Sequence, residues 1–204
     1  MIRVGLTGGI GSGKSTVAEV WESKGAYILN ADDLAKKIMV NDPEVRQQLT
    51  ETFGEESFKP DGSLNRAWLA DQAFRKDRVD ELNRIVHPKI PAATRRHVEE
   101  AERMRYDLFV FEAALLLQNL RPGEFDYIVM VLADEDRRVQ WVSERDDVAG
   151  ENVRDRIESQ QDFSKLTDQA DFIIENDGTL DELKRKAEEL YKTLTREKHR
   201  SGSA

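Results

Sequence analysis

The sequence predicts an α/β fold in which five parallel strands form one sheet flanked by helices. Five short apolar runs have the length and continuity of strands that are buried on both faces of a sheet. Helical patterns separate these runs, and an alternation of strand and helix is typical of a parallel sheet. A glycine-rich turn joins the first apolar run to the first helical pattern.

The boundaries of several elements can be read from local chemistry. The predicted strands cover residues 2–6, 26–29, 108–111, 127–132 and 172–174. Gly25 is placed to end the first helix, because glycine adopts the left-handed conformation that closes many helices. Asp42 and the proline after it predict a helix start, whereas the proline after His87 predicts an interruption. Thr179 and Glu182 form a capping box for the last helix.

Two helical segments interrupt the strand order. Residues 33–106 form a gap too long for a single crossover helix, so we expect a helical substrate-binding insertion there. Residues 146–168 form a shorter helical excursion, which we interpret as a lid. The remaining segments, 1–32, 107–145 and 169–204, make up the predicted nucleotide-binding core.

Composition excludes several classes of function. The 204 residues include no cysteine, which rules out disulfides, thiolate catalysis and cysteine-based metal sites. The net charge of -9 argues against duplex nucleic acid as a partner. No run approaches the roughly 20 apolar residues that span a bilayer, and the first residues do not resemble a signal peptide. We therefore expect a cytoplasmic protein, either a monomer or a weak homo-oligomer.

The turn after the first strand contains the pattern G-x-x-x-x-G-K-S, which begins at Gly8. Its glycines allow a tight turn whose N–H groups surround a phosphate at a helix N-terminus. Lys14 would bridge the β- and γ-phosphates of ATP, and the Ser15 hydroxyl would bind Mg²⁺. The pattern predicts a P-loop NTPase fold. The predicted nucleotide-binding residues are Gly9, Gly11, Ser12, Gly13, Lys14, Ser15 and Thr16.

Other glycine motifs and other P-loop classes fit less well. A dinucleotide-binding G-x-G-x-x-G started at Gly9 would place Lys14 where its third glycine belongs. The N-K-x-D guanine motif of switch GTPases is missing, and residues 109–112 only weakly resemble the acidic strand end of motor ATPases. A small-molecule kinase needs an acceptor-binding insertion, an acid near the second strand and an arginine-bearing lid. The chain has all three in outline.

Asp32 and three arginines are the candidates for chemistry outside the P-loop. Asp32 follows the second strand, at the sheet edge where ligands bind, and could orient a substrate hydroxyl and accept its proton late. The alternative is that Asp32 only caps the next helix, while Asp33 reads as a solvated first-turn residue. Arg145, Arg154 and Arg156 could clamp phosphate oxygens, or they could be solvated or paired with carboxylates.

Taken together, these residues resemble the dephospho-coenzyme A kinase family from residue 5 to about residue 183. Six elements occur in the family's order. They are the loop from Gly5 to Thr16, Ala31-Asp32, His87-Pro88-Lys89-Ile90, Arg145-Asp146, Arg156 with Gln160, and the segment from Ala170 to Gly178.

The resemblance implies ATP-dependent phosphorylation of the ribose 3′-hydroxyl of dephospho-coenzyme A, the last step of coenzyme A biosynthesis, with Mg²⁺ as cofactor. It implies catalytic roles for Asp32, Lys14 and Arg145, with Ser15 as metal ligand. His87 becomes a candidate acceptor contact, or alternatively a helix-end residue set by the proline. Two alternatives stay open: another nucleoside or small-metabolite kinase, and a non-catalytic ATP-binding regulatory module.

The chain departs from the family pattern at two positions. Asn30 stands where the family usually has aspartate, beside Asp32. Gln118 stands where the family usually has glutamate in the segment that begins at Ala114. Glu112 lies nearby in the sequence and could compensate for the missing carboxylate at position 118.

Overall fold

The computed structural model describes residues 1–75, 78–119 and 123–201. These residues form two compact units, one of residues 1–29 and 101–204 and one of residues 30–100. The first unit contains the sheet, and the second is helical. No helix in the described ranges is long and apolar enough to cross a membrane.

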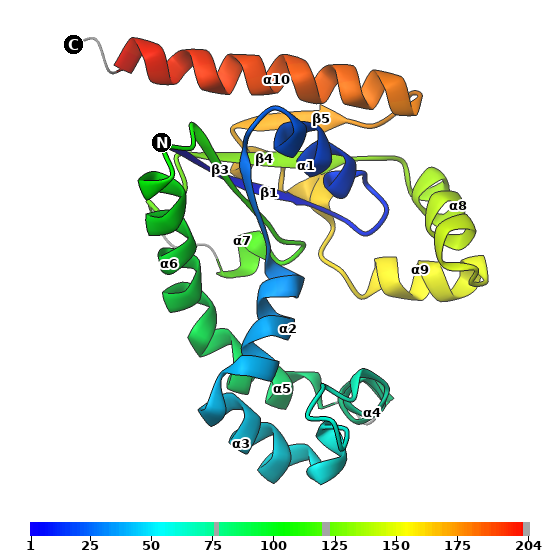
Figure 1. Ribbon diagram of the computed structural model, residues 1–204. Helices are drawn as coiled ribbons and strands as arrows, with labels where there is room; N and C mark the ends of the chain where they lie inside the picture. Colours follow the sequence, from blue (N-terminus) through cyan, green and yellow to red (C-terminus); the bar gives the residue numbers. More distant parts are fainter. Residues whose placement is uncertain (76–77, 120–122, 202–204) are drawn as a thin grey trace. The chain divides into compact units, whose positions relative to one another are not determined.

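A five-stranded sheet with the order β2-β3-β1-β4-β5 forms the centre of the first unit. Strand β1 pairs in parallel with β3 and β4, and β4 pairs in parallel with β5 (Figure 1). This confirms the predicted fold class, and each strand overlaps its predicted run. The strands are β1 (Ile2–Gly8), β2 (Tyr27–Asn30), β3 (Leu108–Glu112), β4 (Tyr127–Leu132) and β5 (Phe172–Glu175).

The helices of the first unit follow from the same sequence patterns. They are α1 (Lys14–Ser23), α7 (Leu116–Asn119), α8 (Glu135–Asp146), α9 (Gly150–Glu158) and α10 (Leu180–Ser201). Helix α1 ends as predicted, because Gly25 has φ +94° and its N–H bonds to the Glu22 carbonyl at 2.9 Å. Helix α10 begins with the predicted capping box, in which Glu182 accepts a hydrogen bond from the Thr179 N–H.

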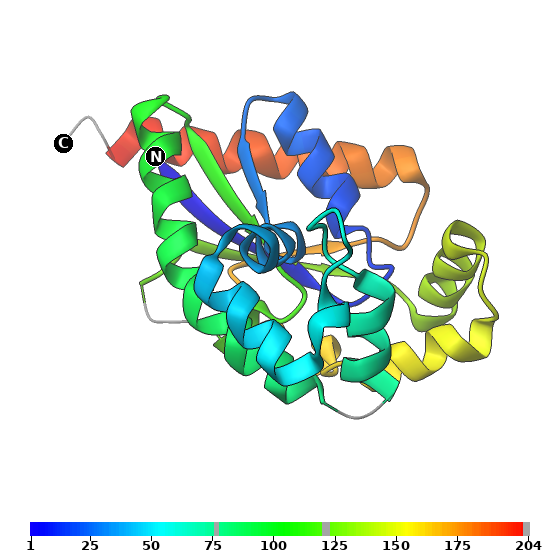
Figure 2. The ribbon, with the colours of Figure 1, turned by 60° about the horizontal axis from the view of Figure 1, so that its bottom comes forward.

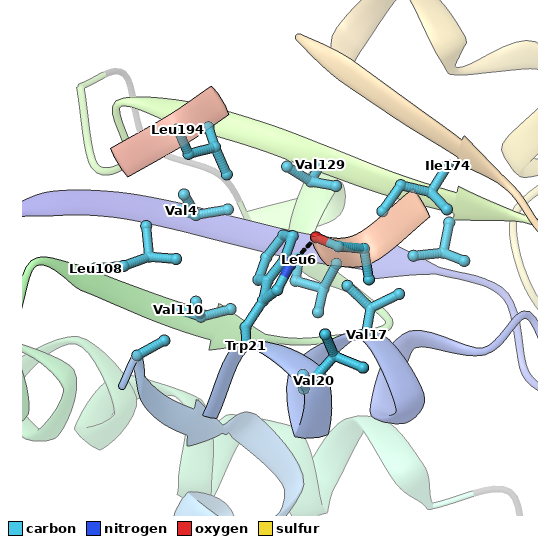
Figure 3. Packing of buried hydrophobic residues seen from close by; sticks show 14 of the residues in the cluster. Val4, Leu6, Val17, Val20, Trp21, Leu108, Val110, Val129, Ile174 and Leu194 are labelled. Atoms are coloured by element: carbon cyan, nitrogen blue, oxygen red, sulfur yellow. Dashed lines mark hydrogen bonds between the residues drawn. The ribbon is translucent and has the colours of Figure 1, made fainter. Parts of the chain in front are cut away.

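The main core lies between one face of the sheet and the pair of helices α1 and α10 (Figure 3). Alternate residues of the strands point into it, so Val4, Leu6 and Val110 are fully buried. Trp21 of α1 is also fully buried, and its indole Nε1 donates a hydrogen bond of 2.8 Å to the Ala187 carbonyl of α10. This bond satisfies the one polar atom of the indole and fixes the two helices against each other.

The second unit is built from α2 (Ala31–Asn41), α3 (Pro43–Phe53), α4 (Arg66–Ala70) and α5 (Val79–Val86). Helix α6 (Ile90–Arg103) continues from it into the first unit. Helix α3 lies against α2 and α5 (Figure 2). Its apolar stripe of Val45, Leu49 and Phe53 is buried, as the helical spacing predicts.

Polar groups fix the ends of these helices. Asp42 caps α3 by accepting hydrogen bonds from the N–H groups of Glu44 and Val45 at 3.0 and 3.1 Å. Helix α5 ends at Val86, and residues 87–89 form a 3-10 turn before α6 begins, which confirms the predicted interruption. The expected reason for it is wrong, because His87 before the proline keeps helical dihedral angles of φ -57° and ψ -37°. Trp68 donates its indole N–H to the Phe53 carbonyl at 2.8 Å.

Candidate active site

The glycine-rich loop of residues 8–13 leaves the carboxyl end of β1 and runs into α1. Gly13 occupies the N-cap of α1 with φ +102°, a conformation that residues with a Cβ atom rarely adopt. At Gly8 a methyl group would collide with the Val131 carbonyl oxygen on the neighbouring strand β4. Glycine is therefore required by backbone conformation at one end of the loop and by close strand packing at the other.

The cationic end of Lys14 lies over the start of this loop. Its Nζ donates hydrogen bonds to the carbonyl oxygens of Gly8 at 2.8 Å and Gly9 at 3.0 Å. The lysine belongs to the first turn of α1, whose free N–H groups give this end of the helix a partial positive charge. A positive side chain and a positive helix end thus meet at one loop, which is the electrostatic arrangement that favours a phosphate group.

Ser15 and Glu112 meet beside Lys14. The Ser15 hydroxyl donates a hydrogen bond of 3.1 Å to Glu112 Oε1. Glu112 is the last residue of β3, which is the strand next to β1, and it is only 6% exposed. The pairing of β1 with β3 aligns Leu6 with Glu112, so the sheet register carries this carboxylate to the start of the loop. Two hard oxygen groups of the kind that Mg²⁺ prefers are therefore adjacent.

The segment after β5 braces the loop from another side. Asn176 is buried, and its Nδ2 donates a hydrogen bond of 3.0 Å to the Ser12 carbonyl oxygen. The Asn176 N–H bonds to the Leu132 carbonyl at the end of β4. Asn176, which belongs to the segment from Ala170 to Gly178, is therefore a structural support of the loop.

The segment after β4 covers the loop with α8 and α9, which pack against each other (Figure 2). The Ile10 N–H of the loop donates a hydrogen bond of 2.8 Å to Gln160 Oε1, just after α9. A methyl group on Gly11 would collide with Val142 and crowd the Arg138 carbonyl of α8. Residues far apart in the sequence thus enclose the tip of the loop within the first unit.

The three arginines predicted for the lid all form ion pairs with carboxylates. Arg145 donates to both oxygens of Asp146, at 2.8 and 3.1 Å, and these bonds lower the pKa of that carboxyl group. Arg156 lies 3.7 Å from the same carboxylate. Arg154 bonds to Glu135 and Asp136 at 3.0 and 2.8 Å. The structure therefore shows the alternative interpretation of these arginines, in which each is paired with a carboxylate.

Sequence reasoning missed Arg138, which lies closer to the loop than the three predicted arginines. A methyl group on Gly9 would collide with its guanidinium, and Nη1 is the nearest side-chain atom. Arg138 lines a cavity of about 500 Å³ together with Gly9, Ser12 and Gln160. The helical pattern from residue 135 indicates arginines near the end of β4, but it does not distinguish Arg138 from Arg137, which donates to the Gly178 carbonyl instead.

The remaining predicted residues belong to the helical unit. Asp32 is exposed in the first turn of α2, and the helix is capped instead by Asn30, whose Oδ1 accepts the Asp33 N–H at 3.0 Å. The alternative in which Asp32 caps the helix is therefore wrong. Asp33 pairs with Lys36 at 2.7 Å, which lowers the pKa of the Asp33 carboxyl, as expected for a surface residue. His87 is exposed at the 3-10 turn.

Together, the sheet order and the glycine loop between β1 and α1 define a protein of the P-loop nucleoside triphosphatase fold. The sequence model of the dephospho-CoA kinase family matches residues 2–182. The chain belongs to this family, whose members catalyse the last step of coenzyme A biosynthesis.

Individual relatives agree with this assignment. The dephospho-CoA kinase of Salinibacter ruber is 42% identical, over 96% of this chain and 98% of the relative. That of Corynebacterium glutamicum is 38% identical, over 93% and 96%. Among solved structures, TT1252 from Thermus thermophilus is similar with a TM-score of 0.75 and 31% identity, over 95% of this chain and 97% of that one. The dephospho-CoA kinase from Campylobacter jejuni shares the fold, with a TM-score of 0.67 and 21% identity.

Proposed function

We propose that the loop of residues 8–16 binds the phosphates of ATP, and that the chain transfers the terminal phosphoryl group to the ribose 3′-hydroxyl of dephospho-coenzyme A. The observation that carries this proposal is the convergence of Lys14, the N-terminus of α1 and the Ser15–Glu112 pair at one glycine loop. Family membership supports the choice of acceptor.

In the proposed mechanism, the bond between the γ-phosphorus and the 3′-oxygen forms as the bond to the β,γ-bridging oxygen breaks, which leaves ADP. Lys14 and the loop N–H groups stabilise the charge that grows on the phosphate oxygens. Lys14 must first exchange its hydrogen bonds to the Gly8 and Gly9 carbonyls for phosphate oxygens. Asp32 orients the acceptor hydroxyl and takes its proton late in the transfer.

The Ser15 and Glu112 oxygens fit a magnesium ion bound together with ATP. Mg²⁺ is usually held by one or two protein oxygens plus substrate phosphates and waters. The Ser15 hydroxyl and the buried Glu112 carboxylate supply two such groups 3.1 Å apart. Within the described ranges, no group of three or more His, Cys, Asp or Glu residues forms a metal cage, and a site shared with a nucleotide needs none. The ion would supply positive charge to the β- and γ-phosphate oxygens.

The helical unit of residues 30–100 is the proposed acceptor domain, with Asp32 and His87 as its candidate contacts. Residues 146–168 are the proposed lid. For Arg145 to reach the ATP phosphates, it must release the Asp146 carboxylate. Exchange of one oxyanion partner for another costs little, because both ends of the exchange are charge-assisted hydrogen bonds.

A coupled ADP-release assay tests the proposed function. The purified chain should release ADP with ATP, Mg²⁺ and dephospho-coenzyme A together, and activity should disappear when EDTA removes the metal. A panel of nucleosides and small alcohols should give no comparable rate. Faster release with another acceptor would favour a different small-metabolite kinase, and ATP binding without transfer to any acceptor would favour a regulatory module.

A further inference from the structure

Arg138 has no part in the mechanism proposed above. Its guanidinium lies against Gly9 of the P-loop and lines the cavity of about 500 Å³ at the carboxyl end of β4. Its Nε is buried without a hydrogen-bond partner, and no carboxylate in the described ranges forms an ion pair with it. The residue as a whole is half-buried, but a buried donor atom without a partner is costly because it has lost its bond to water.

Two other polar atoms that line the same cavity are also buried without a hydrogen-bond partner. Ser12 is only 1% exposed, and its Oγ has no hydrogen-bond partner among the described residues. The Nε2 of Gln161 is also buried there without one. The guanidinium and the NH₂ group of the Gln161 amide are donors only, and the hydroxyl can donate, so this wall of the cavity is suited to an acceptor-rich ligand.

Carboxylates also line the cavity, but most are already neutralised. Glu135 is paired with Arg154 at 3.0 Å. Asp162 accepts hydrogen bonds from the Ser164 N–H and hydroxyl and pairs with Lys165 at 3.0 Å. Glu158 lies on the exposed side of α9. Two cations therefore meet at one residue of the P-loop, because the Lys14 ammonium bonds to the Gly9 carbonyl and the Arg138 guanidinium lies against the same glycine.

We propose that Arg138 is the arginine that binds the terminal phosphate of the bound nucleoside triphosphate from the open side of the P-loop. The inference rests on the proposed function of the loop and goes beyond it, because it assigns the contact with the terminal phosphate to Arg138 near the start of α8, whereas Arg145 lies near the end of that helix. Two cations at one glycine repel each other until an anion lies between them. The planar guanidinium could hold two oxygens of a γ-phosphate that Lys14 contacts from the other side.

Three variants of the full chain test this assignment. Arg138→Gln removes the charge, and Arg138→Met removes it while keeping the apolar stem that packs against Gly11. Arg185→Gln is the matched control, because Arg185 is an exposed arginine of α10 that pairs with Glu189. Calorimetry measures the affinity for Mg²⁺ complexes of ADP and of a non-hydrolysable ATP analogue, and the ADP-release assay measures kcat. Thermal unfolding identifies any variant that does not fold.

Loss of one preorganised donor typically costs on the order of 10²-fold to 10³-fold in kcat, and we expect a loss in that range for Arg138→Gln and Arg138→Met. Their affinity for the ATP analogue should fall towards that for ADP, while ADP affinity stays at the wild-type value. Arg185→Gln should match the wild type. If one Arg138 variant fails to fold, the other gives the result.

Two outcomes would overturn the assignment while leaving the proposed function intact. One is an Arg138 variant that keeps the wild-type kcat and preference for the triphosphate. The other is a variant that loses ADP and ATP-analogue binding equally, which would make Arg138 a support of the loop only. A wild-type chain that neither binds ATP nor releases ADP would instead overturn the proposed function, and this inference with it.

Discussion

At the scale of single residues, the chemistry of this chain is concentrated in side chains whose partners come from distant parts of the sequence. Ser15 bonds to Glu112, Ser12 to Asn176 and Ile10 to Gln160. The motif predicted Ser15 from its type and spacing, but it could not predict which carboxylate would reach it. That pairing depends on the register of β3 against β1, which a single sequence does not encode locally.

Substitution of Asp32, the proposed proton acceptor, should separate catalysis from nucleotide binding. Asp32→Asn keeps the shape of the side chain but removes the proton acceptor, so kcat should fall on the order of 10²-fold or more. The affinity for Mg-ATP, measured by calorimetry, should stay within about twofold, since Asp32 is proposed to contact the acceptor. Asp33→Asn is the matched control, because Asp33 pairs with Lys36 and should be dispensable for turnover. Full activity in Asp32→Asn would remove Asp32 from the mechanism.

Asp42 gives a pH-dependent contribution to the stability of α3. The N–H of Val45 and the nearby Lys89 lower the pKa of the Asp42 carboxyl below its unfolded value. Its stabilisation is therefore complete above pH ~4, near the unfolded pKa, and is lost as pH falls through the folded pKa. Asp42→Ala should cost about 1 kcal/mol at pH 7.

Hydrogen-exchange protection factors for α3, compared between wild type and Asp42→Ala, measure this contribution. The difference between the two proteins should be constant from pH 7 to about pH 5 and should shrink towards pH 3. A difference that stays unchanged at pH 3 would show that the stabilisation does not come from the ionised carboxylate.

At the scale of elements, much of the fold follows from the sequence. The five strands were predictable because buried parallel strands are continuous apolar runs, and the caps at Asp42, Gly25 and Thr179 have local chemical causes. The order of the strands has no such local signature. The lid arginines were predicted from type and spacing alone, and the structure pairs all three with carboxylates contributed by α8.

The packing of α1 against α10 depends on the buried indole of Trp21. Trp21→Phe removes the hydrogen bond to the Ala187 carbonyl and leaves unfilled volume in a fully buried site. We expect a loss of about 2 kcal/mol in the free energy of unfolding. Urea denaturation followed by circular dichroism measures it.

Tyr191→Phe is the control for that experiment. The Tyr191 hydroxyl donates to the Lys24 carbonyl at 2.7 Å, also between α1 and α10, but this bond lies at the exposed edge. Its removal should cost about 0.5 to 1 kcal/mol. Equal losses in the two variants would mean that burial at Trp21 does not decide the stability of this helix pair.

At the scale of the whole molecule, we propose that each of the two units binds one of the two substrates. The nucleotide loop lies in the unit of residues 1–29 and 101–204, while Asp32 and His87 belong to residues 30–100. Hydrogen-exchange mass spectrometry should therefore show that a Mg-bound ATP analogue protects residues 8–16. Dephospho-coenzyme A should protect peptides within residues 30–100, and adenosine is the control ligand. Protection of the helical unit by neither substrate would remove its assignment as the acceptor domain.

Phosphorus NMR tests the proposed phosphoryl transfer directly, because it detects the phosphate groups of substrates and products. In a ³¹P NMR time course of the purified chain with ATP, Mg²⁺ and dephospho-coenzyme A, the γ-phosphate signal should decay. Signals of ADP and of a new 3′-phosphomonoester should grow at the same rate, and mass spectrometry should identify the product as coenzyme A. Persistence of the γ-phosphate signal, or its conversion to inorganic phosphate alone, would contradict the proposed transfer.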